Sequence, residues 1–110
     1  MRLIIGGFAQ GKLNYASSHY DLQECGLINH FHEWMKERIS QGGCPEEEIV
    51  KFLKEHPDCV IISDEIGNGI VPMDAFEREY RERTGRLLVE LASRAEEVVR
   101  VICGIGQKIK

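Results

Sequence analysis

The chain contains no apolar run that approaches the roughly 20 residues needed to span a bilayer, and no charged N-terminal segment followed by a long apolar stretch. We therefore expect no contact with a membrane and no secretory signal, and we expect the protein in the cytoplasm. Its four cysteines form no CxxC pair. This spacing argues against a cysteine metal site and against a disulfide framework.

An excess of positive charge is also absent. Fourteen Lys and Arg residues stand against 18 Asp and Glu residues, for a net charge of −4. Nucleic-acid binding relies on basic surfaces, so we expect no nucleic-acid partner. The 110 residues, of which 43% are hydrophobic and 29% charged, predict a single domain over residues 1–110. A chain this short buries a modest share of its surface, which favours self-association.

Hydrophobic patterning predicts strands that alternate with helices. We expect strands over residues 2–5, 59–62 and 98–103, helices over 12–19, 27–39, 45–56 and 74–95, and a brief strand or turn over 21–25. Residues 63–72 are expected to form a loop, and a basic tail is expected to follow the last strand. This order favours an α/β fold with a small, mostly parallel sheet flanked by helices.

The first strand is followed by a glycine-rich loop. Gly6, four further residues, Gly11 and Lys12 have the spacing of a phosphate-binding P-loop. Glycine lets the backbone fold tightly, partly at positive φ, so that N–H groups and a helix N-terminus face a phosphate. Lys12 would place its charge on the β and γ oxygens. The predicted nucleotide-binding residues are Gly6, Gly7, Phe8, Ala9, Gln10, Gly11, Lys12 and Leu13.

A second motif follows the strand at residues 59–62. Residues 63–72 read Ser-Asp-Glu-Ile-Gly-Asn-Gly-Ile-Val-Pro, and ligands of open α/β sheets bind beyond the carboxyl ends of strands. Asp64 and Glu65 place two carboxylates at that edge. Taken alone, the motif is typical of a turn with solvated acids.

The motif does not stand alone. With Phe76-Glu77-Arg78-Glu79-Tyr80-Arg81, Gly85-Arg86-Leu87 and Ala95-Glu96-Glu97-Val98, it resembles the adenosylcobinamide kinase / adenosylcobinamide-phosphate guanylyltransferase family of cobalamin biosynthesis. The order and spacing match over residues 59–104, and residues 6–12 are similar to the family's G-G-x-x-S-G-K loop. The resemblance implies a reduced RecA-like P-loop fold and a homo-oligomer, a trimer in the family. It also implies ATP or GTP as substrate with Mg²⁺, and transfer of the γ-phosphate to adenosylcobinamide, a corrinoid.

The resemblance also implies roles for single residues. Lys12 would act on the phosphates, and Glu65 would orient the acceptor or a metal-bound water. Glu24-Cys25-Gly26-Leu27 is similar to the family's D-C-L-T segment, which makes Glu24 the metal partner. Leu13 stands where the family has a serine, whose hydroxyl serves Mg²⁺.

The chain departs from the family in one further respect. Nothing between Tyr20 and Asp21 reproduces the family's segment with the histidine that accepts GMP. The resemblance therefore supports the kinase activity more than the guanylyltransferase activity. The alternative is a catalytically inactive paralogue that binds a nucleotide or a corrinoid, or serves as a scaffold.

The remaining polar clusters favour structural roles. His19 is predicted at the surface and His56 at a helix end. His30 and His32 lie two residues apart, so on a continuous helix they point to different faces and no metal pair is predicted. The arginines at 78, 81, 83 and 86 are balanced by neighbouring glutamates. They predict a solvated helix face, although in the family's context some would reach a triphosphate or the neighbouring subunit.

Overall fold

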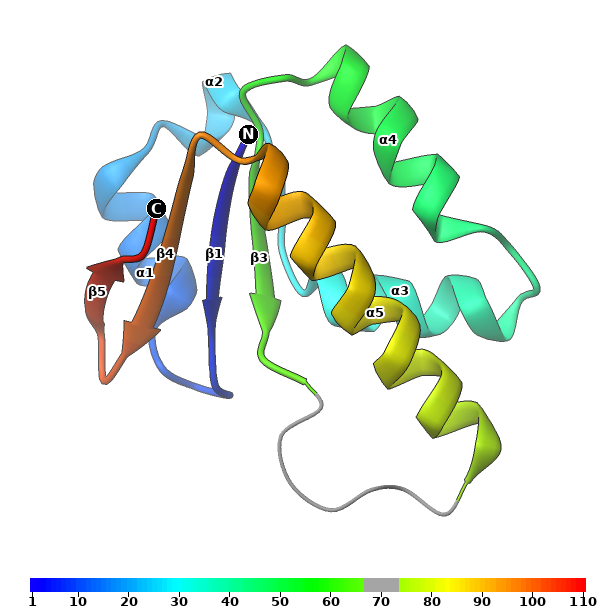
Figure 1. Ribbon diagram of the computed structural model, residues 1–110. Coiled ribbons are helices and arrows are strands. Elements are labelled where there is room, and N and C mark those ends of the chain that lie inside the picture. The colour runs from blue at the N-terminus through cyan, green and yellow to red at the C-terminus, as the bar shows by residue number, and fades with distance from the viewer. Residues whose placement is uncertain (67–73) are drawn as a thin grey trace.

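The computed structural model describes residues 1–66 and 74–110. Its sheet has the strand order β2-β3-β1-β4-β5. β1 runs parallel to both β3 and β4, β2 runs parallel to β3, and β5 is antiparallel to β4 (Figure 1). The strands are β1 Arg2–Gly6, β2 Leu27–Ile28, β3 Val60–Asp64, β4 Glu97–Ile102 and β5 Ile105–Lys108. The predicted α/β fold with a mostly parallel sheet is confirmed, and it is consistent with a reduced P-loop type.

The described residues also form five helices. They are α1 Lys12–His19, α2 Leu22–Cys25, α3 Phe31–Ser40, α4 Pro45–Glu55 and α5 Ala75–Arg94. Local chemistry sets two of their starts. α4 begins with Pro45, whose fixed φ suits the first turn, and three glutamates follow it there. α5 begins where the Asp74 carboxylate accepts a hydrogen bond of 2.7 Å from the Phe76 N–H, as the sequence predicted.

The core lies on both faces of the sheet because side chains alternate along each strand. On β1, Leu3 packs with α3, α4 and α5, whereas Ile4 packs on the side of α1 (Figure 1). Phe31 and Met35 of α3 are fully buried on the first face. β1 is therefore held from both faces and by two neighbouring strands, and this fixes the position of the loop that follows it.

The helix predicted over residues 27–39 begins later than expected. Residues 27 and 28 pair with β3 as a short strand, and the helix begins only at Phe31. The reason is His30, whose φ of 54° is left-handed and cannot continue a right-handed helix. Residues 22–25 form one helical turn, capped by the Asp21 carboxylate, which accepts from the Glu24 N–H.

Where we expected a basic tail after the last strand, the chain forms a further strand. Cys103 and Gly104 have φ values of 50° and 76°, which is the backbone of a tight hairpin turn. The tail therefore returns as β5 along β4. Ser63 and Asp64 likewise extend β3 instead of opening the loop. Residues 67–73, which hold most of the second motif, lie outside the described residues.

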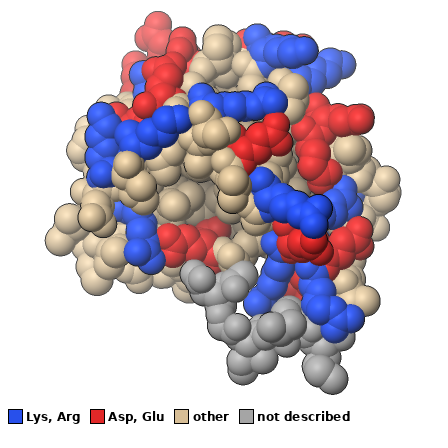
Figure 2. Space-filling model, in the orientation of Figure 1, with Lys and Arg blue, Asp and Glu red and all other residues tan. Residues whose placement is uncertain are grey.

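Charged side chains of both signs are interspersed over the face shown in Figure 2. On α5, Arg86 contacts Glu82, and Arg83 pairs with Glu79 at 3.4 Å and with Glu46 of α4 at 2.9 Å. The exposed Arg86 pair agrees with the predicted solvated helix face, whereas Arg83 links α5 to α4. Over residues 1–66 and 74–110, no helix is both long and apolar enough to cross a membrane.

Candidate functional site

The candidate site lies at the edge of the sheet where β1, β3 and β4 end (Figure 1). A cavity of about 280 Å³ opens there between the glycine-rich loop, the end of β3 and the start of α3. Its walls are formed by residues 8–14, Asn29, His30, His32, Glu33, Ile62 and Asp64. This is the edge at which ligands bind in open α/β sheets.

The glycines of the loop serve two different needs. Gly11 has a φ of 88°, a left-handed conformation that suits glycine and lets the chain turn into α1. Gly6 is not at positive φ, but a Cβ there would lie 2.5 Å from the carbonyl oxygen of Val101 on β4. The predicted positive φ is thus found at Gly11, while Gly6 allows close approach of two strands.

The turn between β4 and β5 holds the loop in shape. The Gly104 N–H donates to the Gln10 carbonyl at 2.7 Å, and the Cys103 N–H donates to the Gln10 side-chain oxygen at 2.8 Å. Sequence reasoning missed these two contacts because it expected residues 104–106 only to end the last strand, with a basic tail after them. The two contacts make Gln10 a positioning residue for the loop.

The N-terminus of α1 faces the cavity. The first hydrogen bond of the helix runs from the Tyr15 N–H to the Gly11 carbonyl, so the N–H groups of Lys12, Leu13 and Asn14 have no partner within the helix. Residues 12–14 belong to the cavity wall. An anion in the cavity therefore meets free backbone donors and the positive end of a helix dipole.

Lys12 is the centre of the site's charge. Its side chain is only 8% exposed, and its Nζ lies 2.7 Å from Asp64 Oδ1 and donates to the Gly7 carbonyl at 2.6 Å. Asp64 ends β3 directly beside Gly6 in the parallel register. Sequence reasoning placed Asp64 at this edge but did not pair it with Lys12. The register of two adjacent strand ends is the signal that predicts the pair.

Asp64 also contacts His32. Its backbone N–H donates to His32 Nδ1 at 3.1 Å, and its Oδ2 lies 3.4 Å from His32 Nε2. Burial lowers the pKa of His32 below its usual value, despite the opposing influence of the Asp64 carboxylate. Burial therefore favours the neutral form of the His32 ring.

Neither of the other two predicted site carboxylates lies with Lys12. Glu65 donates its N–H to the Gly6 carbonyl at 2.8 Å, but its carboxylate pairs with Arg100 at 2.7 Å and lines a separate cavity beside α5. Glu24 is an exposed residue of α2, which Figure 1 shows at the opposite edge of the sheet. Asp64 is the carboxylate that the structure brings to the loop.

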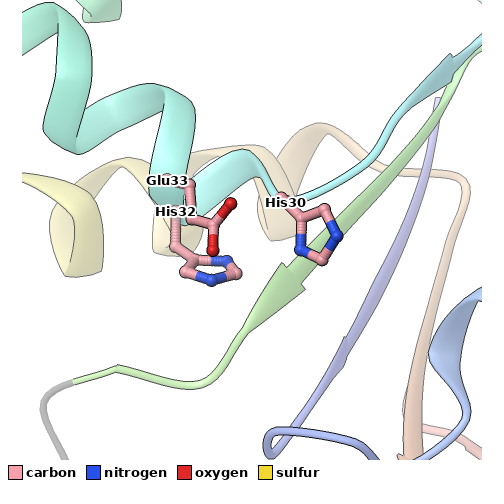
Figure 3. A group of neighbouring side chains, drawn as sticks. All are labelled: His30, His32 and Glu33. Atoms are coloured by element: carbon pink, nitrogen blue, oxygen red, sulfur yellow. The ribbon is translucent and has the colours of Figure 1, made fainter.

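His30, His32 and Glu33 form a group beside this pair. One ligand atom from each lies within 4.8 Å of the others (Figure 3). The expectation that the two histidines point to different faces was wrong. It assumed a continuous helix, whereas the left-handed His30 stands outside α3 and its ring centre lies 6.0 Å from that of His32.

Two curated relatives share a stretch of 51 residues with this chain at 45% identity. They are the bifunctional adenosylcobalamin biosynthesis proteins CobU of Salmonella typhimurium and of Escherichia coli. The stretch covers 46% of this chain and 28% of each relative. The family described as cobinamide kinase / cobinamide phosphate guanyltransferase matches residues 23–109, a range that holds Asp64 and the histidine group but begins after the glycine-rich loop. With most of its length matched, the chain belongs to the cobinamide kinase / cobinamide phosphate guanyltransferase family.

Proposed function

We propose that this chain binds a nucleoside triphosphate on residues 6–13 and transfers its γ-phosphate to adenosylcobinamide in cobalamin biosynthesis. The observation that carries the proposal is the buried Lys12 ammonium, held at the cavity by Asp64 and the Gly7 carbonyl. Burial of a charged group costs free energy, so a buried charge needs partners. Here the partners hold the Lys12 ammonium beside the free backbone N–H groups of α1. We infer adenosylcobinamide as the acceptor from the chain's family and from the relatives' role in adenosylcobalamin biosynthesis.

The residues of the chain supply positioning and charge, which are the main needs of phosphoryl transfer. Lys12 exchanges the Gly7 carbonyl for a phosphate oxygen, and the N–H groups at the start of α1 bind the remaining oxygens. Gln10, bound to the β4–β5 turn, keeps the loop in its cradle shape before the nucleotide arrives. Because the cradle is already formed, little ordering is left to oppose binding.

Magnesium fits the carboxylate at this site. Mg²⁺ prefers oxygen ligands and is held by one or two carboxylates together with substrate phosphates. Asp64 offers such oxygens on the cavity wall, whereas Leu13 has no hydroxyl. We propose Asp64, instead of Glu24, as the carboxylate that holds the ion, whose chemistry is to neutralise phosphate charge. ATP or GTP as the nucleotide, and a homo-oligomer such as a trimer, belong to the same proposal.

One observation favours the second candidate, an inactive paralogue that binds a nucleotide or a corrinoid. Leu13 is 43% exposed at the place where a P-loop carries the hydroxyl for Mg²⁺. Without that ligand, phosphate binding can persist while transfer is lost.

The first experiment is a calorimetric titration with ATP and with GTP, each with and without Mg²⁺, followed by an assay of γ-phosphate transfer to adenosylcobinamide. We expect binding that Mg²⁺ strengthens, and transfer. Binding without transfer would support the inactive paralogue. No binding of either nucleotide at millimolar concentration would overturn the proposed kinase and leave a corrinoid-binding or scaffold paralogue.

The carboxylate that holds Mg²⁺ can be identified by two matched variants. We expect Asp64→Asn to remove the gain in nucleotide affinity that Mg²⁺ gives, because the amide loses the ligand charge. Glu24→Gln, the same chemical change at an exposed position of α2, is expected to keep that gain. The measurement is the ratio of dissociation constants with and without Mg²⁺. The reverse pattern would return the role to Glu24.

A further inference from the structure

The group of His30, His32 and Glu33 has the composition of a transition-metal site. Two imidazoles and one carboxylate converge at the start of α3, with one ligand atom from each within 4.8 Å of the others. Figure 3 shows the Glu33 carboxylate close to the His32 ring, with the His30 ring on the same side of the helix end. All three side chains belong to the wall of the cavity.

The backbone produces this convergence. His32 and Glu33 lie in the first turn of α3, and His30 precedes that turn in a left-handed conformation with a φ of 54°. His30 makes no side-chain capping hydrogen bond to the helix. Its ring meets the His32 ring edge-on at 6.0 Å, although a helical residue at this spacing would point elsewhere.

We propose that His30, His32 and Glu33 bind a late first-row divalent cation, of which Zn²⁺ is the type. Imidazole nitrogens together with a carboxylate oxygen suit such ions, whereas Mg²⁺ prefers oxygen ligands alone. The site goes beyond the proposed function, since it requires no nucleotide.

The contacts of His32 decide which of its ring nitrogens carries the lone pair that a metal would need. The Asp64 N–H donates to Nδ1 at 3.1 Å, and Nε2 lies 3.4 Å from Asp64 Oδ2. Nδ1 therefore carries the lone pair that accepts this hydrogen bond, and the proton sits on Nε2, the nitrogen near the Asp64 carboxylate. A carboxylate behind the non-ligating nitrogen orients metal-bound histidines in many proteins. Binding at Nδ1 replaces one hydrogen bond and leaves this tautomer unchanged.

The site can close around an ion. Ligand atoms about 2.0–2.1 Å from a tetrahedral Zn²⁺ lie about 3.3 Å apart, so the present spacing must shorten. His30 and Glu33 are exposed and free to adjust, while the buried His32 is the fixed member. The nearby Lys12 charge is already paired with Asp64 at 2.7 Å, which limits its repulsion of a second cation.

Three protein ligands leave room for one more. In zinc proteins with three protein ligands, the fourth position holds a water or a substrate atom. Here the site borders the same cavity as Lys12 and the start of α1. The exchangeable ligand is therefore a water or an oxygen of an anion in the cavity.

The test uses Co²⁺ as a spectroscopic substitute for Zn²⁺, titrated into the nucleotide-free protein. We expect saturable binding of a single equivalent, visible in the cobalt d–d absorption, that Zn²⁺ displaces and excess Mg²⁺ does not. His30→Asn and Glu33→Gln are each expected to weaken binding by at least about tenfold. Asparagine is chosen because it tolerates the left-handed backbone. His56→Ala, which removes an exposed histidine at the end of α4, is the control and should bind as the natural chain does.

Three outcomes overturn the proposal. They are the absence of saturable Co²⁺ binding, binding that neither substitution weakens, and a thiolate-to-cobalt absorption band, which would assign the ion to cysteine. Because no nucleotide is present, failure here leaves the nucleotide titration untouched. Equally, a protein that binds Co²⁺ but no ATP or GTP loses the proposed function and keeps the metal site.

Discussion

Replacing Lys12 by alanine is expected to lower the affinity for ATP and GTP by about tenfold to a hundredfold, the effect of losing one charge-assisted hydrogen bond. Lys12 is the only basic side chain in the described cavity wall apart from two histidines. No other ammonium or guanidinium of that wall can replace it. Calorimetric titration of both proteins with each nucleotide measures the loss.

Two further variants separate the charge of Lys12 from its packing. The Lys12 stem is buried, so alanine leaves a void, whereas Lys12→Met fills that space and removes only the charge. We expect Lys12→Ala and Lys12→Met both to lose nucleotide affinity, and Lys12→Met to keep more thermal stability. Lys54→Ala, on the exposed side of α4, removes the same charge away from the cavity and should bind normally. Unchanged binding by Lys12→Met would refute the role of the loop.

The glycine-rich loop was predictable because its signal is local. Glycine spacing, the lysine and the preceding apolar strand lie within residues 1–13, and the backbone that they require is found at Gly11 and in α1. The partner of Lys12 was not predictable in this way. Asp64 meets the loop through the parallel register of β1 and β3, which aligns Gly6 with Asp64 across more than fifty residues of chain.

Two other predictions were wrong for a different physical reason. The apolar spacing at residues 27–39 predicts a helix. The left-handed backbone of His30 delays the start of that helix to Phe31 and directs the His30 ring toward His32. Periodicity reports burial, not a single backbone dihedral. Likewise β5 is mostly exposed and lacks apolar alternation, and backbone pairing with β4 makes it a strand. A pattern of buried side chains cannot detect such an element.

Replacing Gly6 by alanine is expected to lower the free energy of unfolding by about 1–3 kcal/mol, the usual range for overpacking. The added Cβ would lie 2.5 Å from the Val101 carbonyl oxygen, a backbone atom of the neighbouring strand that no side-chain rotation can move. Gly6 and Val101 face each other in the parallel register, and Val101 is fully buried. β1 must therefore move relative to β4. Urea denaturation of the two proteins measures the difference.

Gly85→Ala is the matched control, because the same methyl group meets no atom within 4 Å at that position of α5. In a helix interior alanine is favoured over glycine by roughly 0.5–1 kcal/mol, so Gly85→Ala should be more stable than the natural chain. The two substitutions should change the free energy of unfolding in opposite directions. This difference distinguishes the effect of close strand approach from that of helix propensity. The β4–β5 turn holds Gln10, so a shift of β1 against β4 also distorts the loop. Gly6→Ala should therefore weaken nucleotide binding as well, and equal stability of the natural chain and this variant would contradict the close approach of the two strands.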